Sequence, residues 1–125
     1  MFNAIKVCIY VDDIQRSVDF YTQKLGFEIA VAHPMGPAAK WTELVYNHGQ
    51  LRLIPYPKSM MPDWKERKPS IVFSCANVGE TYDELRKRGV GFKGPPEKMG
   101  WGNFAHFADP DGNEFGLSDA PLTPE

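Results

Sequence analysis

Apolar and polar residues alternate in the first segment of the chain. Over residues 4–11 the odd-numbered side chains are apolar, which predicts a β-strand with one buried face. The residues on that face are Ile5, Val7, Ile9 and Val11. The residues on the opposite face are Lys6, Cys8 and Tyr10.

The apolar period then changes from two residues to between three and four, which predicts a helix. Its apolar stripe consists of Ile14, Val18, Tyr21 and Leu25. Asp12 or Asp13 is placed to cap the start of this helix, because a side-chain oxygen at that position accepts a hydrogen bond from the first turn. Gly26 is placed to end it in a left-handed conformation.

Three further strands are expected over residues 27–33, 40–47 and 50–56, separated by turn-forming Pro, Gly and Asn residues. The first module, about residues 4–56, is therefore predicted to be βαβββ. Residues 57–69 contain several prolines and are expected to form a linker with at most a short helix.

The same order of elements is predicted again in the second half. A strand is expected over 70–78 and a helix over 79–89 that ends at Gly89. Three strand candidates follow around VGFKG, GNFAHFAD and NEFGLS. The second module, about residues 69–119, is therefore also predicted to be βαβββ.

A constant spacing of 64 residues supports an internal duplication. It pairs the helix caps Asp13 and Asn77, and it pairs Leu53 with Leu117 in the last strand of each module. The fold class predicted from this repeat is α+β. Two tandem modules are expected to form one domain over residues 1–125, with an open, cup-shaped mixed sheet and the helices outside. A concave sheet of this kind is expected to be a ligand site, since it gathers side chains from several strands.

Charge and composition exclude several classes of function. The chain has 125 residues, with 14 basic and 16 acidic side chains and a formal net charge of −2. This balance argues against a nucleic-acid or anionic-membrane surface. The sequence has no apolar run long enough to span a bilayer and no signal-peptide pattern at its start, so a cytoplasmic protein is expected.

Nucleophilic and disulfide chemistry also find little support in the sequence. Cys8 and Cys75 lie in apolar, strand-like segments and are expected to be small buried hydrophobic residues. The turn DPDGN, residues 109–113, is given a structural role, because Asp, Pro, Gly and Asn each favour tight turns. No catalytic residue is predicted.

Two segments together resemble a known family. The stretches IYVDDIQRSVDFYTQKLGFEI and FADPDGNEFGLSD are similar to the vicinal oxygen chelate superfamily. This superfamily includes glyoxalase I, extradiol dioxygenases, and fosfomycin- and bleomycin-resistance proteins. The resemblance spans essentially the whole chain, and it is more specific for the fold than for any one activity.

The resemblance implies four metal-ligand positions, on the first and fourth strands of each module. In this sequence these positions hold Lys6, Arg52, Ser70 and Gly116. None of them is a usual ligand of a divalent metal, and two are cations that would repel the ion. We therefore predict no metal and no cofactor.

Two interpretations of Lys6 and Arg52 stay open at this point. The two cations either bind an anionic group of a ligand, or they form ion pairs with Glu43 or Glu114 that fill the site. Aromatic residues near the expected rim are placed to clamp a planar or cationic ligand. The predicted cavity residues are Lys6, Trp41, Arg52, Ser70, Trp101 and His106.

The first functional hypothesis is a metal-free protein that binds or sequesters a small molecule, anionic or aromatic, in the sheet cavity. It follows the resemblance to bleomycin-resistance proteins, which also implies a homodimer. The second hypothesis is an enzyme: a glyoxalase-like lyase or dioxygenase with a rearranged metal site, or a metal-free isomerase with Lys6 as base. The third is a vestigial domain kept for assembly with a partner.

Overall fold

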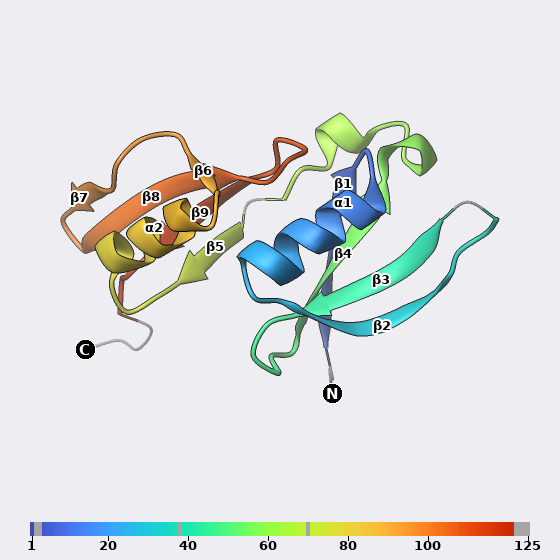
Figure 1. Ribbon diagram of the computed structural model, residues 1–125, viewed down its shortest axis with the longest axis horizontal. Coiled ribbons are helices and arrows are strands. Elements are labelled where there is room, and N and C mark those ends of the chain that lie inside the picture. The colour runs from blue at the N-terminus through green and yellow to red at the C-terminus, as the bar shows by residue number, and fades with distance from the viewer. Residues whose placement is uncertain (2–3, 38, 70, 122–125) are drawn as a thin grey trace. The chain divides into compact units, whose positions relative to one another are not determined.

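The computed structural model divides into two compact units, Met1–Pro69 and Ser70–Glu125 (Figure 1). It describes residues 1, 4–37, 39–69 and 71–121. Within this described part, no helix is long and apolar enough to cross a membrane. The two units are taken in turn below.

The first unit forms a four-stranded sheet and a helix within its described residues. Its elements are β1 (Ile5–Val11), α1 (Ile14–Asp19), η1 (Phe20–Lys24), β2 (Glu28–Pro34), β3 (Lys40–Val45) and β4 (Leu51–Pro57). The strand order is β1-β4-β3-β2, with β1 parallel to β4 and the other pairs antiparallel. The helix and the strands expected from the sequence are therefore present.

Local signals fix both ends of the first helical segment. The Asp13 side chain accepts a hydrogen bond from the backbone N–H of Arg16 at 3.0 Å, so Asp13 is the cap. The helix continues from α1 into the π-helical turn η1. Gly26, with φ of +83°, then reverses the chain, as predicted.

The buried face of β1 follows the predicted alternation only in part. Ile9 and Val11 are fully buried, whereas Ile5 at the start of the strand is 62% exposed. The prediction that Ile5 belongs to the buried face is therefore wrong. Periodicity assigns a face to each residue, but it does not tell how far along the strand that face is covered.

The segment after β4 forms two single-turn 3-10 helices among the described residues, η2 (Lys58–Met60) and η3 (Trp64–Glu66). Lys58 links this segment to the start of α1. Its Nζ lies 3.4 Å from an Asp12 carboxylate oxygen and 4.2 Å from the centre of the Trp64 ring. An ion pair and a cation–π contact therefore position a segment that the sequence identifies only as a linker.

The second unit repeats this topology with one additional strand. Its elements are β5 (Ile71–Ser74), α2 (Val78–Lys87), β6 (Gly91–Phe92), β7 (Glu97–Met99), β8 (Gly102–Ala108) and β9 (Glu114–Ser118). The order β5-β9-β8-β6 matches that of the first unit, and β7 also pairs with β8. The short strand β7 was not predicted, because three residues beside a glycine-rich turn carry no readable period.

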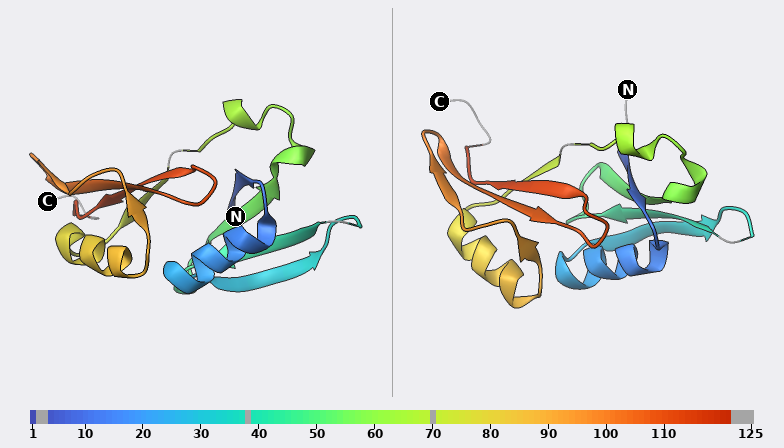
Figure 2. Two further views of the ribbon diagram at one scale, coloured as in Figure 1. Left: turned by 45° about the horizontal axis from the view of Figure 1, so that its top comes forward. Right: turned by 90° about the horizontal axis from the view of Figure 1, so that it is seen from above.

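Helix α2 lies along one face of the second sheet (Figure 2). An aromatic core joins the helix to that face. Phe73, Phe107 and Phe115 have ring centres 5.4–5.8 Å apart. Tyr82 of α2 meets Phe92 at 4.7 Å. These rings supply the apolar contact area that fixes the helix on this sheet.

The turn at residues 109–113 is held by a buried carboxylate. One oxygen of Asp109 accepts hydrogen bonds from the backbone N–H groups of Asp111 and Asn113, at 2.9 and 2.8 Å. Its other oxygen accepts from the Asn113 side-chain amide at 2.9 Å. Gly112 has φ of +78°. These contacts give the turn a structural role.

The α+β class and the two tandem modules with open sheets are confirmed. In both units the first and last strands are parallel neighbours and the helix follows the first strand. That the two modules act as a single domain over residues 1–125 stays a prediction.

Candidate functional site

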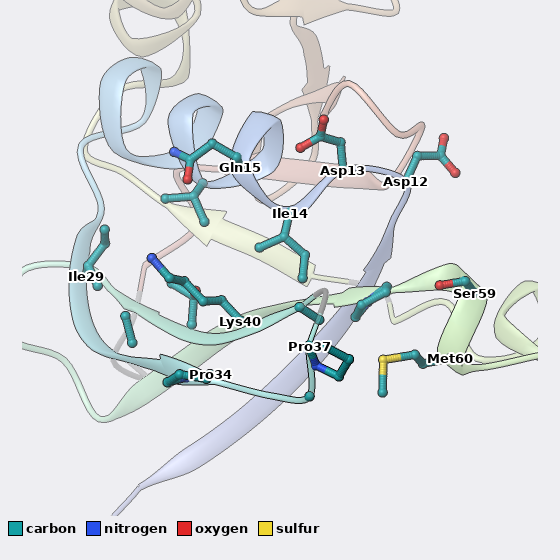
Figure 3. Close-up of a pocket in the computed structure, with 16 residues that line it drawn as sticks. Asp12, Asp13, Ile14, Gln15, Ile29, Pro34, Pro37, Lys40, Ser59 and Met60 are labelled. Carbon is teal, nitrogen blue, oxygen red and sulfur yellow. The ribbon is translucent and has the colours of Figure 1, made fainter.

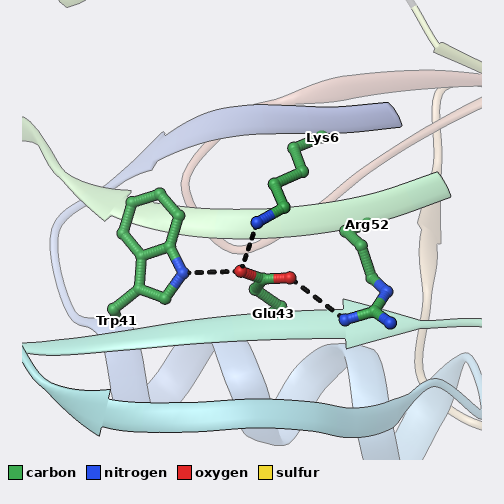
Figure 4. A network of polar contacts seen from close by, with 4 residues as sticks. All are labelled: Lys6, Trp41, Glu43 and Arg52. Atoms are coloured by element: carbon green, nitrogen blue, oxygen red, sulfur yellow. Dashed lines mark hydrogen bonds and ion pairs between the residues drawn. The ribbon is translucent and has the colours of Figure 1, made fainter. Parts of the chain in front are cut away.

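The face of the first sheet opposite α1 carries a group of polar side chains that we call the Glu43 cluster: Lys6, Trp41, Glu43 and Arg52 (Figure 4). Lys6 and Arg52 are direct neighbours across β1 and β4. One Glu43 oxygen, Oε2, accepts hydrogen bonds from Lys6 Nζ at 2.9 Å and from Trp41 Nε1 at 2.8 Å. The other, Oε1, accepts from Arg52 Nη1 at 3.0 Å.

The Glu43 carboxylate is buried, with 4% of the residue exposed, and both of its oxygens are bonded. The hydrogen bond from Trp41 is the main cause that lowers the pKa of Glu43, and Lys6 and Arg52 add to it against the opposing effect of burial. A lowered pKa keeps the carboxylate charged. The cluster then has two cations and one anion.

The structure bears on both interpretations of Lys6 and Arg52. Both cations form ion pairs with Glu43. Glu114, the other predicted partner, pairs with Lys93 in the second unit. The Lys6 side chain is 52% exposed, and Arg52 Nε has no hydrogen-bond partner among the residues described. The ion pairs are therefore present, and they leave donor capacity unused.

Three rings form an aromatic row on the same face: Trp41, Tyr56 and Tyr10. Trp41 meets Tyr56 edge to face at 6.5 Å, and Tyr56 meets Tyr10 at 6.2 Å. Tyr10 and Tyr56 are direct neighbours across β1 and β4. The sequence predicted Trp41 and the orientation of Tyr10, but it missed Tyr56. Its even-numbered position on β4, the same face as Arg52, was the available signal.

In the second unit Gly116 lies next to an aromatic ring. A Cβ atom added at Gly116 would lie 2.3 Å from Cζ of Phe104. Across the sheet, Gly116 pairs with Val72 on one side and with His106 on the other. Ser70, which was predicted as the first-strand partner of Gly116, lies outside the described residues.

Strand pairing shows that Phe104 and Glu43 hold equivalent places in the two units. Leu44 pairs with Leu53 in the first sheet, and Ala105 pairs with Leu117 in the second. Glu43 precedes Leu44, as Phe104 precedes Ala105. A third-strand side chain therefore covers the fourth-strand position in each unit, with a carboxylate at Arg52 and a phenyl ring at Gly116.

Trp101 and His106, the remaining predicted site residues, flank this ring. Trp101 is 49% exposed and meets Phe104 edge to face at 5.8 Å. His106 is exposed and meets Phe104 at 4.8 Å. We call Trp101, Phe104 and His106 the Phe104 cluster. The sequence predicted its two outer members and missed the central ring.

A separate cavity of about 880 Å³ lies on the α1 side of the first sheet (Figure 3). Ile14 of α1 points into it, and Ile29, Pro37 and Lys40 of the β2–β3 hairpin line it together with Met60. It contains none of the six residues predicted for the ligand cavity. Sequence periodicity did not indicate this cavity, because its walls come from a turn, a linker and the rim of a hairpin.

Comparison with known protein families shows what this fold is. Residues 4–117 match the family described as the Glyoxalase/Bleomycin resistance protein/Dioxygenase superfamily. The chain belongs to this superfamily. The resemblance read from the sequence is therefore confirmed.

Individual members of the superfamily are similar over nearly the full chain. The uncharacterized protein YetH of Bacillus subtilis (strain 168) is 45% identical, over 90% of this chain and 94% of its own. A superfamily member from Sphaerobacter thermophilus DSM 20745 is 30% identical, with a TM-score of 0.82 over 95% of this chain and 98% of that one. TnmS3, an antibiotic binding protein from Streptomyces sp. CB03234, is 25% identical, with a TM-score of 0.78 over 97% and 98%.

The metal that the superfamily resemblance implies does not fit the residues at these positions. Lys6 and Arg52 are cations already bonded to Glu43, and Gly116 offers no ligand atom. Throughout the described ranges, no group of three or more His, Cys, Asp or Glu side chains is arranged to hold a metal ion. A divalent cation beside Lys6 and Arg52 would be repelled by both.

Proposed function

We propose that this protein binds a small molecule, anionic or aromatic, without using a metal. The proposed site is the face of the first sheet opposite α1, which we call the open face. The observation that carries the proposal is the Glu43 carboxylate bonded to Lys6, Arg52 and Trp41. At two of the superfamily's metal-ligand positions this protein has the cations Lys6 and Arg52 instead of neutral or anionic ligands. A carboxylate, rather than a metal cation, lies between them. Binding without chemical conversion is the function that such a centre supports best.

The aromatic side chains support the second part of the proposal. The aromatic row lies beside the Glu43 cluster, and the Phe104 cluster exposes Trp101. Planar ligands stack on such rings, and ligand sites are commonly lined by aromatic groups with a few polar ones. The similarity to TnmS3, an antibiotic binding protein, agrees with sequestration. We extend the proposal to a homodimer, as the superfamily resemblance implies, and to a cytoplasmic location, as expected from the sequence.

The test combines metal analysis with a ligand screen by thermal shift. We expect well under about half a mole of transition metal per chain, and ligands that raise the melting temperature equally with and without a chelator. One tightly held metal per chain, with ligand stabilisation lost on chelation, would overturn the proposal. Turnover of the methylglyoxal–glutathione hemithioacetal would favour the lyase alternative. A broad screen with no stabilising compound would favour an assembly role.

A further inference from the structure

We infer that the ligand of the open face is an aromatic acid, and that Lys6 and Arg52 bind its acidic group. This inference rests on the proposed function and specifies its ligand. The acidic group is a carboxylate or sulfonate attached to a planar ring system. The argument uses the charge of the Glu43 cluster, its unused donors and the position of the aromatic row.

The Glu43 cluster has a net positive charge. Two cations share one carboxylate, and each of them is in direct contact with it. Glu28, a further acidic residue of this sheet, pairs with Val45, and Val45 lies between it and Arg52. A second anion at the cluster would balance the remaining charge. A cationic ligand would be repelled there.

The cluster also has hydrogen-bond donors left for a second anion. A lysine ammonium has three N–H donors, and Lys6 has one contact with Glu43 while half of its side chain is exposed. A guanidinium has five donors, and the contact of Arg52 with Glu43 uses only Nη1. The Arg52 side chain is 29% exposed, which leaves it accessible to an acceptor group, and its buried Nε lacks a partner in the described chain.

Glu43 holds the cations in place for this role. Because its carboxylate is buried and bonded on both oxygens, Lys6 and Arg52 are fixed on one side by a rigid partner. Fixed donors lose less conformational freedom when a ligand binds. The carboxylate is therefore a positioning residue, and the two cations contact the ligand.

The aromatic part of the ligand is inferred from one Glu43 oxygen that bonds both a cation and an aromatic side chain. Oε2 of Glu43 bonds both Lys6 and the Trp41 indole, so the ammonium and the indole edge lie side by side. An acid bound at Lys6 thus places its attached group against the aromatic row. A planar ring there makes edge or face contacts with Trp41 and Tyr56, whereas a flexible polar chain makes neither.

The test uses a matched ligand pair, 2-naphthoate and its neutral analogue 2-naphthamide, titrated into the full chain by NMR. We expect naphthoate to bind about fivefold to tenfold more tightly, as for a charge-assisted contact that is partly exposed. Lys6→Gln and Arg52→Gln should each remove that preference. Lys6→Arg should keep it, which separates loss of charge from loss of fold.

Lys40→Gln is the control variant. It removes the same charge from the same sheet, but Lys40 lines the cavity on the α1 side. It should leave the preference unchanged. If Lys40→Gln abolishes it and Lys6→Gln does not, the acid binds in that cavity and the inference fails. Equal affinity for both naphthalenes, or binding of neither, also overturns the inference. The proposed function then stands or falls separately on the broad ligand screen.

Discussion

Gly116 gives the sharpest test of how the second unit is packed. Replacing it with alanine adds a Cβ atom 2.3 Å from Cζ and 3.1 Å from both Cε atoms of Phe104. Carbon atoms in contact normally lie about 3.5–4.0 Å apart, so the ring must retreat by about 1 Å or more. This movement disturbs the edge contacts of Phe104 with Trp101 and His106.

The expected size of the effect is a balance of two terms. Overpacking of this kind costs about 1–3 kcal/mol. Exchanging glycine for alanine where the backbone allows it returns about 0.4–1 kcal/mol by restricting the unfolded chain. We therefore expect Gly116→Ala to lower the free energy of unfolding by about 1–2 kcal/mol, measured by urea denaturation.

A double-mutant cycle assigns this cost to the ring. In a Phe104→Ala background the obstacle is gone, so Gly116→Ala should become neutral or stabilising by up to about 1 kcal/mol. Gly91→Ala is the control, since a Cβ there meets no atom of the described chain within 4 Å. A destabilisation at Gly116 that persists without Phe104, or its absence in the wild type, would refute the packing argument.

Three further changes test other parts of the chain. Glu43→Gln should destabilise by about 1–2 kcal/mol near neutral pH, since it leaves Lys6 and Arg52 without their buried counter-charge. Because folding lowers the pKa of Glu43, its charge stabilises the folded protein above the unfolded pKa of about 4.3, and this stability is lost as pH falls through the folded pKa. When the free energy of unfolding is measured against pH, this acid-dependent loss should be absent in Glu43→Gln. A pH profile equal to that of the wild type would contradict the argument. Ser17→Ala should be neutral or stabilising by up to about 1 kcal/mol, because Ser17 Oγ is buried with no partner in the described ranges; a clear drop in urea midpoint would reveal a missed contact. Asp109→Ala should cost about 1–3 kcal/mol through loss of three turn hydrogen bonds, and a thermal midpoint equal to wild type would rule that out.

Periodicity and capping signals predicted most of the fold. The first strand, the first helix and its cap at Asp13 follow from local rules that tertiary contacts do not override here. The glycines at 26 and 89 take the expected positive φ. What local rules could not give is the strand β7, whose pairing with β8 depends on a tight turn rather than on its own pattern.

The central residue of the Phe104 cluster was harder to predict than its outer residues. Lys6 and Arg52 were found because the resemblance gave their positions and strand alternation gave their face. Phe104 was missed for a geometric reason. The 64-residue spacing pairs Glu43 with Phe107, whereas strand pairing places Phe104 there. The cause is a different separation between paired residues of the last two strands, nine residues from Leu44 to Leu53 but twelve from Ala105 to Leu117. A single spacing cannot follow such a change.

The sequence also could not choose between the two roles of Lys6 and Arg52. Charge alone shows that Glu43 is available on a neighbouring strand, but not that its carboxylate is directed between the two cations. That depends on the register of β3 against β4, where Val45 lies opposite Arg52 and Glu43 is two pairs further along, beyond the Leu44–Leu53 pair. The long arginine side chain spans this offset.

Restoring one carboxylate would therefore not restore the superfamily's metal chemistry. Gly116→Glu supplies the missing ligand atoms, but the Cβ atom of the new side chain would overlap the Phe104 ring. In the first unit, the superfamily's two ligand positions hold Lys6 and Arg52, which supply no ligand atom, and the Glu43 carboxylate is bonded to both of them. Titration of Gly116→Glu with nickel or zinc should give no stoichiometric binding, and the Phe104→Ala, Gly116→Glu pair should give none either. Tight binding by the double variant would contradict this prediction, because a single restored carboxylate would then be enough to hold a metal.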